Sequence, residues 1–239
     1  MNRDFYSKYV STHTANLYGE ADKDKAQKSF VILDSYFGKL LPKNKNAKIL
    51  DAGCGKGDFV FWLAHLGFSN VRGVDISTEQ IEVGKKAGFT NIYEGNVFDE
   101  LSKNVDEYDV IIARDILEHF TKDEAVRFCK QTRESLKEEG TLIIQTVNAE
   151  NLLWGRLRYG DFTHEQAFTE TSMRQLLMVA GFGEIAIYPQ RPVIHGIKSL
   201  VRYIIWRFFE LMLGFYLLVE TGSWSSVFTQ NLLAVAIKK

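Results

Sequence analysis

The chain has 239 residues, of which 46% are hydrophobic and 25% charged, and 29 Lys plus Arg against 30 Asp plus Glu give a formal net charge of −1. This composition excludes a disordered, collagen-like or small disulfide-stapled protein, and the length suits one large α/β domain or two small ones. The balanced charge gives no general electrostatic reason to bind nucleic acid, so we expect no nucleic-acid partner.

The two cysteines, Cys54 and Cys129, stand far apart with no CxxC pair and no His-rich neighbour. This spacing predicts neither a disulfide framework nor a zinc site. The first twenty residues lack the continuous apolar run of a secretion signal. We therefore expect a cytoplasmic protein with reduced cysteines.

The first predicted element is a helix over residues 23–41. Apolar side chains at positions 30, 33, 37, 40 and 41 follow the three- and four-residue spacing of one helix face, and Pro42 closes the segment. We expect residues 1–45 to form an N-terminal helical cap, with this helix lying across the core.

From residue 48 onward, short β-rich runs alternate with helical patterns. Strands are predicted at 48–50, 71–76, 91–97, 108–113, 141–147, 184–189 and 227–239, with helices near 57–67, 78–87, 122–137 and 171–180. The nearly continuous Val and Ile of the central strands are typical of a parallel sheet covered on both faces. The sequence therefore predicts a doubly wound α/β fold, with its core at 46–190 and a final core strand at 226–239.

Residues 191–225 form a predicted helical insertion of unusual composition. The charged residues Lys198, Arg202, Arg207 and Glu210 fall outside an apolar arc when 193–219 is placed on a helix at 100° per residue. The residues of this arc are Val193, Ile194, Ile197, Leu200, Val201, Ile204, Ile205, Phe208, Leu211, Met212, Phe215, Leu218 and Val219. The charges argue against a transmembrane span. Two interpretations remain open: a buried lid or dimer-forming helix pair broken at Gly196 or Gly214, giving a homodimer, or an interfacial helix making peripheral membrane contact.

Three alternating glycines, Gly53, Gly55 and Gly57, follow a strand that ends near Asp51 and precede a helix. Glycine permits the sharp strand-to-helix turn and lets a ligand approach the main chain closely. A dinucleotide fingerprint requires a glycine where Asp58 stands, and the P-loop pattern is absent. The turn therefore predicts a ligand site and argues against a nicotinamide cofactor.

Polar residues also follow the next two predicted strands. Asp75 ends the second strand, where a carboxylate can accept both hydroxyls of a ribose. Asn96 and Val97 follow the third strand, where an amide side chain and a backbone N–H suit an adenine edge, although a polar residue there also fits ordinary turn chemistry. Together these positions predict a nucleoside ligand without a pyrophosphate.

This ordered set resembles class I S-adenosylmethionine-dependent methyltransferases. Asp51-x-Gly53-x-Gly55-x-Gly57 looks like the first motif of that family, Asp75 like its ribose-binding acid, Asn96-Val97 like its adenine contact, and residues 108–113 like its fourth strand. The resemblance covers about residues 46–190 and the final strand. It implies a Rossmann-like sheet of seven strands with the last strand antiparallel. It also implies S-adenosyl-L-methionine as cofactor, held by Asp51, Gly53, Cys54, Gly55, Gly57, Asp75, Ile76, Asn96, Val97, Ala113 and Arg114.

Methyl transfer from a sulfonium is an in-line displacement in which positioning does much of the work, but an oxygen acceptor must also lose its proton. One candidate set for this step is Asp115, Glu118 and His119, just after the fourth strand. Similar segments in ubiquinone-type O-methyltransferases bind a divalent metal that activates a hydroxyl. In other methyltransferases the same residues anchor the local turn, so a metal at this set is the alternative to a metal-free site.

The second candidate set lies in the segment 154–169 after the fifth strand, which is rich in Arg, aromatic residues, His and Asp. His164 is the preferred general base, with Asp161 or Glu165 as its orienting carboxylate. The competing interpretation is that His164 braces the helix that begins near Thr171.

Residues 161–169, 176–177 and 180–182 are similar to bacterial methyltransferases of surface-polysaccharide pathways, and so is the opening segment 9–13, which could fold over the methionine end of the cofactor. This resemblance implies a small-molecule or glycan acceptor, namely a sugar hydroxyl of a surface glycan or its precursor. Two alternatives stay open: a metal-assisted O-methyltransferase of a quinone pathway, and a non-catalytic cofactor-binding scaffold.

Overall fold

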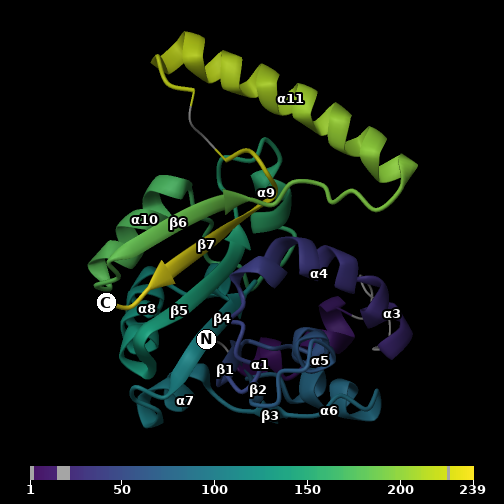
Figure 1. The fold of residues 1–239 in the computed structure, drawn as a ribbon, viewed down its shortest axis with the longest axis vertical. Coiled ribbons are helices and arrows are strands. Elements are labelled where there is room, and N and C mark those ends of the chain that lie inside the picture. Colours follow the sequence, from purple (N-terminus) through teal and green to yellow (C-terminus); the bar gives the residue numbers. More distant parts are fainter. Residues whose placement is uncertain (1–2, 15–21, 225–226) are drawn as a thin grey trace.

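A computed structural model describes residues 3–14, 22–224 and 227–239 of the chain. Its centre is a seven-stranded sheet with the strand order β3-β2-β1-β4-β5-β7-β6 (Figure 1). The strands are β1 Ile49–Ala52, β2 Val71–Asp75, β3 Ile92–Glu94, β4 Tyr108–Arg114, β5 Leu136–Val147, β6 Glu184–Pro189 and β7 Asn231–Ile237. The first five strands are parallel, and β7 runs antiparallel to both β5 and β6. The predicted Rossmann-like sheet with an antiparallel last strand is confirmed.

Helices cover both faces of this sheet, in two separate hydrophobic clusters. One cluster is built from α7 Val97–Lys103, α8 Lys122–Ser135 and α10 Glu170–Val179, and the other from α3 Lys23–Lys28, α4 Phe30–Phe37, α5 Asp58–His65 and α6 Thr78–Lys86. The remaining elements are α1 Arg3–Tyr6, η1 Val10–Thr14, η2 Gly38–Leu40, η3 Leu117–His119, α9 Trp154–Arg158 and α11 Ile197–Thr221.

The two clusters explain why the central parts of the strands are mainly apolar. Successive side chains of a strand point to opposite faces, so in β1 Ile49 enters one cluster and Leu50 the other. In β4, Ile112 and Ile111 divide in the same way. Because both faces are buried, both sets of alternating positions are mainly apolar, and Asp51 is a buried exception in β1.

The strand order places a topological switch beside β1, which pairs with β2 on one side and β4 on the other. The connections that leave β1 and β4 lead to opposite sides of the sheet, because α5 belongs to one cluster and α8 to the other. Ligands of doubly wound sheets bind in the crevice that opens at such a point, beyond the carboxyl ends of the strands. The glycine-rich turn follows β1 and therefore lies at this crevice.

Several predicted boundaries were wrong. The helix expected over residues 23–41 is divided at Ser29, whose hydroxyl donates to the Ala26 carbonyl at 2.6 Å and so competes with the helical hydrogen bond. The third strand stops at Glu94 because Asn96 caps the next helix. The fifth strand begins at Leu136, where the sequence predicts the end of a helix.

The insertion before β7 is one continuous helix, α11, and Gly214 lies inside it. The expected helix pair broken at Gly196 or Gly214 is therefore wrong; Gly196 precedes the helix, which begins at Ile197 and not at residue 193. Figure 1 shows α11 standing apart from the sheet and its covering helices. None of the helices in the described part of the chain is long and apolar enough to cross a membrane.

Candidate functional site

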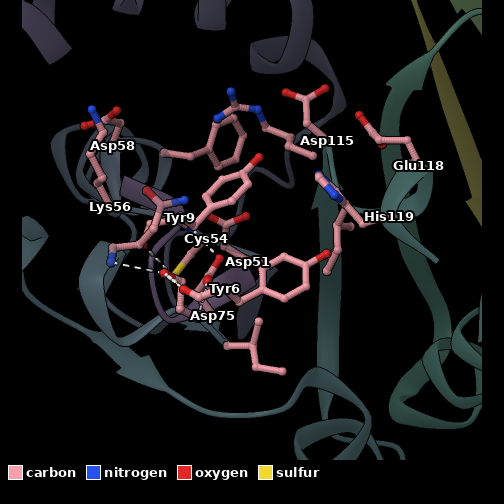
Figure 2. A pocket seen from close by; sticks show the side chains of 18 of the residues that line it. Tyr6, Tyr9, Asp51, Cys54, Lys56, Asp58, Asp75, Asp115, Glu118 and His119 are labelled. Atoms are coloured by element: carbon pink, nitrogen blue, oxygen red, sulfur yellow. Dashed lines mark hydrogen bonds between the residues drawn. The ribbon is translucent and has the colours of Figure 1, made fainter. Parts of the chain in front are cut away.

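A cavity of about 650 Å³ lies at the carboxyl ends of β1, β2 and β4. Its walls come from the glycine-rich turn, from the turns after β2, β3 and β4, from the N-terminal segment and from the segment before α10. Figure 2 shows Asp51, Cys54 and Asp75 on the side of the turn, with His119 across the pocket and the Tyr6 and Tyr9 rings projecting into it. A cavity of this size and mixed polarity suits a small organic ligand.

The backbone of the turn requires its glycines. Gly53 has φ +77°, and a Cβ there would lie 2.8 Å from Ile116 Cδ1. Gly57 has φ +95°, and a Cβ there would lie 2.7 Å from Ile92 Cγ2. Gly53 and Gly55 line the cavity, whereas Gly57 is not among its lining residues and serves the approach of the turn to β3.

Asp75 lies on the cavity wall and orders the turn. Its Oδ2 accepts the Gly55 N–H at 2.8 Å and its Oδ1 accepts the Ser77 N–H at 2.8 Å. Burial raises the pKa of this carboxyl, and the two N–H donors oppose that change. Each carboxylate oxygen has a second lone pair, so Asp75 retains the capacity to accept two hydroxyls of a ribose.

A buried acid, Asp51, and a half-buried cation, Arg114, lie at the carboxyl ends of β1 and β4. Burial raises the pKa of Asp51 to about 7, and the Arg114 charge opposes this rise. The Arg114 guanidinium lies 4.7 Å from the centre of the Phe59 ring, and its Nε is buried with no hydrogen-bond partner among the described residues. An unpaired buried donor at a cavity wall suits an anionic ligand group such as a carboxylate.

The other predicted cofactor residues divide into two groups. Cys54, Ile76, Asn96 and Val97 line the cavity, although the Asn96 Oδ1 accepts the Phe98 N–H at 2.9 Å and so caps α7. Burial raises the pKa of the Cys54 thiol well above its usual range, which suits packing and not nucleophilic attack. Ala113 is not among the lining residues; it is fully buried in the sheet core.

Asp161 is the centre of a polar cluster at the other end of the cavity. Its Oδ2 accepts the Tyr9 hydroxyl at 2.5 Å and lies 3.3 Å from His13 Nε2. Its Oδ1 accepts the Thr163 backbone N–H at 2.9 Å and the Thr163 hydroxyl at 2.7 Å. Burial alone would favour the protonated acid, but the hydrogen bonds from Tyr9 and Thr163 hold the pKa of Asp161 below its usual range. Asp161 is therefore an ionised carboxylate.

The hydrogen bonds around His164 fix its tautomer. Its Nδ1 lies 2.9 Å from the Leu157 carbonyl oxygen, which can only accept, so Nδ1 carries the proton. The Nε2 of the neutral ring is then an unprotonated acceptor, 4.0 Å from Asp161 Oδ2. Burial lowers the pKa of His164, and Asp161 opposes this change. His164 thus presents a free basic nitrogen at neutral pH.

His119 lies beside His164, with a ring centroid separation of 4.6 Å. Its Nδ1 is 2.9 Å from Thr163 Oγ1, whose single proton is already donated to Asp161, so His119 Nδ1 donates. Burial and then the neighbouring His164 lower the pKa of His119 to about 4. The structure therefore places two neutral imidazoles at one end of the cavity.

The metal set considered from the sequence is not assembled in this structure. Both carboxylate oxygens of Asp115 accept from Gln145 Nε2. Glu118 Oε2 accepts the Thr146 hydroxyl at 2.8 Å. Burial and the nearby Asp115 raise the pKa of Glu118 to about 8, so Glu118 is a neutral acid at pH 7. Its backbone carbonyl accepts the Glu165 and Gln166 N–H groups. Glu118 thus anchors the local turn to the segment that carries His164, and these residues do not fit a metal site.

Within the described part of the chain, the group of metal-ligating side chains that does converge is His119, Asp161 and His164, with one possible ligand atom from each within 4.8 Å of the others. The two Asp161 oxygens, however, already accept the Tyr9 and Thr163 donors. These hydrogen bonds leave Asp161 one lone pair, on Oδ2, and His13 Nε2 lies 3.3 Å from that oxygen. We derive no step through a metal.

Sequence reasoning missed part of this cluster. Tyr6 and Tyr9 lie within about one turn of the N-terminal segment and both face His119, with ring separations of 6.1 and 6.2 Å. Val10 N–H donates to the Glu79 carboxylate at 2.8 Å, which holds this segment against the start of α6. The spacing of Tyr6, Tyr9 and His13 is the one signal in the sequence that marks a common face. Glu165, considered as an alternative partner for His164, is exposed.

A family profile described as a methyltransferase domain matches residues 28–186, which is more than half of the chain. The chain therefore belongs to this methyltransferase domain family. Two solved structures show the same fold. A SAM-dependent methyltransferase of Archaeoglobus fulgidus superposes with a TM-score of 0.65 at 18% identity, covering 90% of this chain and 97% of that one. A Thermotoga maritima protein described as a possible histamine N-methyltransferase gives a TM-score of 0.63 at 17% identity, with both chains fully covered.

Curated relatives are similar over part of the chain. A ubiquinone biosynthesis O-methyltransferase of Bartonella quintana is 30% identical over 115 residues, which is 46% of this chain and 45% of that protein. A protein of the same name from Pelagibacter ubique is 36% identical over 107 residues, which is 44% of this chain and 43% of that protein. These matches span a little under half of each relative.

Proposed function

We propose that the protein transfers a methyl group to the hydroxyl of an aromatic ring, with S-adenosyl-L-methionine as the methyl donor and His164 as the general base. S-adenosylmethionine supplies an electrophilic methyl group when bound. The turn at Gly53 and Gly55, the ribose-competent carboxylate of Asp75 and the unpaired Arg114 Nε fit this cofactor. The family membership of residues 28–186 supports the same conclusion.

The observation that carries the proposal is the free Nε2 of His164 on the cavity wall. A general base must be unprotonated at the working pH and within reach of the hydroxyl proton. When Nε2 accepts that proton, the new positive charge lies 4.0 Å from the ionised Asp161 and the Nδ1 proton stays on the Leu157 carbonyl. His164 can therefore take the proton without changing its tautomer or its orientation.

An aromatic hydroxyl matches this base better than a sugar hydroxyl. A phenol has a pKa of about 10, whereas an aliphatic hydroxyl is a much weaker acid. Because burial lowers the pKa of His164, its conjugate acid is strong and it deprotonates the more acidic hydroxyl more readily. Tyr6, Tyr9 and His119 provide ring faces beside the base, and aromatic rings stack favourably on such faces.

The names of the relatives support the same acceptor class. The curated relatives are ubiquinone biosynthesis O-methyltransferases, whereas the similarity to sugar methyltransferases rests on sequence motifs alone. We therefore favour a quinone-pathway acceptor over the surface-glycan acceptor that the sequence suggested. The third interpretation is a non-catalytic scaffold. A scaffold does not require two neutral imidazoles side by side at the cavity, whereas a general base does require a neutral imidazole.

The test is an acceptor comparison with the purified chain. Catechols with and without an apolar tail, and methyl glycosides, are incubated with methyl-labelled cofactor, and the labelled product is identified by mass spectrometry. We expect label on the catechol oxygen, at a rate that a divalent-metal chelator does not change. Label on the glycosides alone would restore the glycan interpretation, and loss of the rate with chelator, restored by added metal, would contradict the metal-free base.

A further inference from the structure

Helix α11 is oriented opposite to an ordinary surface helix. Its large apolar side chains point away from the body of the protein; Ile197, Phe208, Phe215 and Val219 are 83%, 60%, 60% and 71% exposed. Ser199, on the inward side, is only 4% exposed, and Glu210 on the same side is half-buried. The exposed apolar residues of the helix are Ile197, Leu200, Val201, Ile204, Ile205, Phe208, Phe209, Leu211, Met212, Phe215, Tyr216, Leu218 and Val219. We call these residues the outer face of α11.

Specific contacts fix this orientation. Glu210, on the inward side, pairs with Arg191 at 3.0 Å and with Arg207 at 2.5 Å. The Arg191 carbonyl in turn accepts the Tyr36 hydroxyl of α4 at 2.6 Å. Gly214, also inward, lets the Trp224 ring pack on the helix, since a Cβ there would lie 3.1 Å from that ring. Turning the outer face toward the body would break these contacts, so its exposure is built into the fold.

The outer face is wide and has cations at its edges. The outer face covers about 180° of the helix surface when successive residues are placed 100° apart. Leu200 and Leu218 mark one limit of this arc, and Phe209 marks the other. Lys198 and Arg202 stand at one edge and Arg207 at the other. Exposed apolar patches of this size mark an interaction site. A wide apolar face edged by Lys and Arg is typical of helices that lie in the headgroup region of a bilayer.

We propose that α11 docks this protein on an anionic membrane surface, with the helix parallel to the bilayer plane and its outer face in the acyl boundary. Anionic lipid headgroups complement the exposed cations Lys198 and Arg202 at one edge. The inference goes beyond methyl transfer, since it concerns a surface that shares no residue with the cofactor cavity.

The width of the outer face favours a bilayer over a second copy of the chain. A helix that packs on one partner helix uses a narrow apolar seam, whereas a helix sunk to its midline in a bilayer buries half of its circumference. The apolar arc of α11 covers about half of the helix. In a helix pair, Phe209 at one limit of the arc and Leu200 at the other would both remain in water.

The segment that leads to α9 is tied to the chain that follows α11. Asn151 Nδ2 donates to the Phe228 carbonyl at 2.9 Å, in the chain that returns from α11 to β7. The neighbours of Asn151, Leu152 and Leu153, are 73% and 65% exposed. These two side chains are thus further exposed apolar groups, on the segment that leads to α9.

Vesicle cosedimentation of the intact chain tests the proposal, without cofactor or acceptor. We expect binding to vesicles of phosphatidylglycerol and phosphatidylcholine, and much weaker binding to phosphatidylcholine alone or in high salt. Phe208→Glu should reduce the partition coefficient at least about tenfold, from the lost burial of one aromatic side chain. Lys198→Gln should reduce it about fivefold on anionic vesicles. Met178→Glu is the matched control, because Met178 is an equally exposed apolar residue on α10.

Folding of each variant is checked by its thermal transition, and the self-association of each is measured by sedimentation velocity. Absence of binding to anionic vesicles by the wild-type chain overturns the proposal. An equal loss of vesicle binding in Phe208→Glu and Met178→Glu also overturns it. A wild-type dimer that Phe208→Glu dissociates, with no vesicle binding, would instead assign the outer face to a second copy. Because no turnover is measured, failure here leaves the proposed methyl transfer untouched.

Discussion

Replacement of His164 by asparagine removes the basic nitrogen Nε2 and leaves the rest of the site in place. The asparagine amide can keep the donor to the Leu157 carbonyl, which the histidine makes through Nδ1 at 2.9 Å, but it has no counterpart of Nε2. A positioned general base contributes about 10²- to 10⁴-fold to a rate. The expected loss in kcat is therefore about 10²- to 10⁴-fold, equivalent to about 3 to 5 kcal/mol in activation free energy.

The pH profile gives this variant a second readout. Because burial lowers the pKa of His164, the wild-type imidazole is unprotonated through neutral pH, and its rate should fall only as the pH drops below the ordinary histidine range of about 6.5. The residual rate of His164→Asn should lack this acidic limb. Cofactor binding, measured by calorimetry with S-adenosylhomocysteine, should be unchanged, because Asp75 and the glycine turn are intact.

Glu165→Gln is the matched control, since Glu165 is adjacent in sequence but exposed. We expect this variant to keep the wild-type rate and pH profile. A kcat for His164→Asn within about threefold of the wild type, at normal cofactor affinity, is too small for a lost general base and would refute the assigned role.

Three further predictions follow from the same site. Burial lowers the pKa of His119 from the ordinary 6.5 to about 4, so the neutral ring stabilises the fold above pH 6.5 and this stabilisation is lost as the pH falls through 4. Between pH 6.5 and 4 the free energy of unfolding, measured with denaturant, should therefore fall by on the order of 3 kcal/mol more for the wild type than for His119→Asn. Burial raises the pKa of Glu118 to about 8, so the stabilisation that its protonated form gives the fold is fully present below about pH 4.5 and is lost as the pH rises through 8. Glu118→Gln should therefore raise the free energy of unfolding relative to the wild type at pH 9 but not at pH 5. An equal change at both pH values would contradict the buried neutral acid. Asp75→Asn should weaken S-adenosylhomocysteine binding about 10- to 100-fold, since hydrogen bonds to a charged group contribute about 1.5–3 kcal/mol; unchanged affinity by calorimetry would remove Asp75 from the cofactor site.

The sheet was predictable because its signals are local. Buried parallel strands are apolar at most positions, and residues 49–50 and 110–113 show this without any tertiary information. The turn at Gly53 was predictable for a similar reason, since its backbone requires glycine. The boundaries that failed depend on side-chain hydrogen bonds, such as the Ser29 hydroxyl on the Ala26 carbonyl, which compete with the helix at a single residue.

The polar cluster around Asp161 was harder to predict because its members come from distant segments. His164 and Asp161 were identified by their local concentration, but the carboxylate of Asp161 is held mainly by Tyr9 and Thr163, and not directly by His164. The Tyr9 contact joins residues 152 positions apart. Sequence spacing within one segment carries no signal for such a pairing. The same limit explains why Asp115, Glu118 and His119 looked like one set although their side chains have separate partners.

The direction of α11 shows a different limit of sequence reasoning. Periodicity gives the width of an apolar arc, but an arc is compatible with either side of the helix facing the protein. In this chain the contacts that decide it include one inward acid, Glu210, and the cations Arg191 and Arg207 that pair with it. An ion pair that is 11% exposed on its acidic side costs more to break than an exposed one. Glu210→Leu, which removes the inward charge, should therefore release the helix to rotate its apolar residues toward the body, and vesicle binding should fall although every residue of the outer face is retained. Retained binding by a folded Glu210→Leu chain would show that the outer face is held outward by something other than this ion pair.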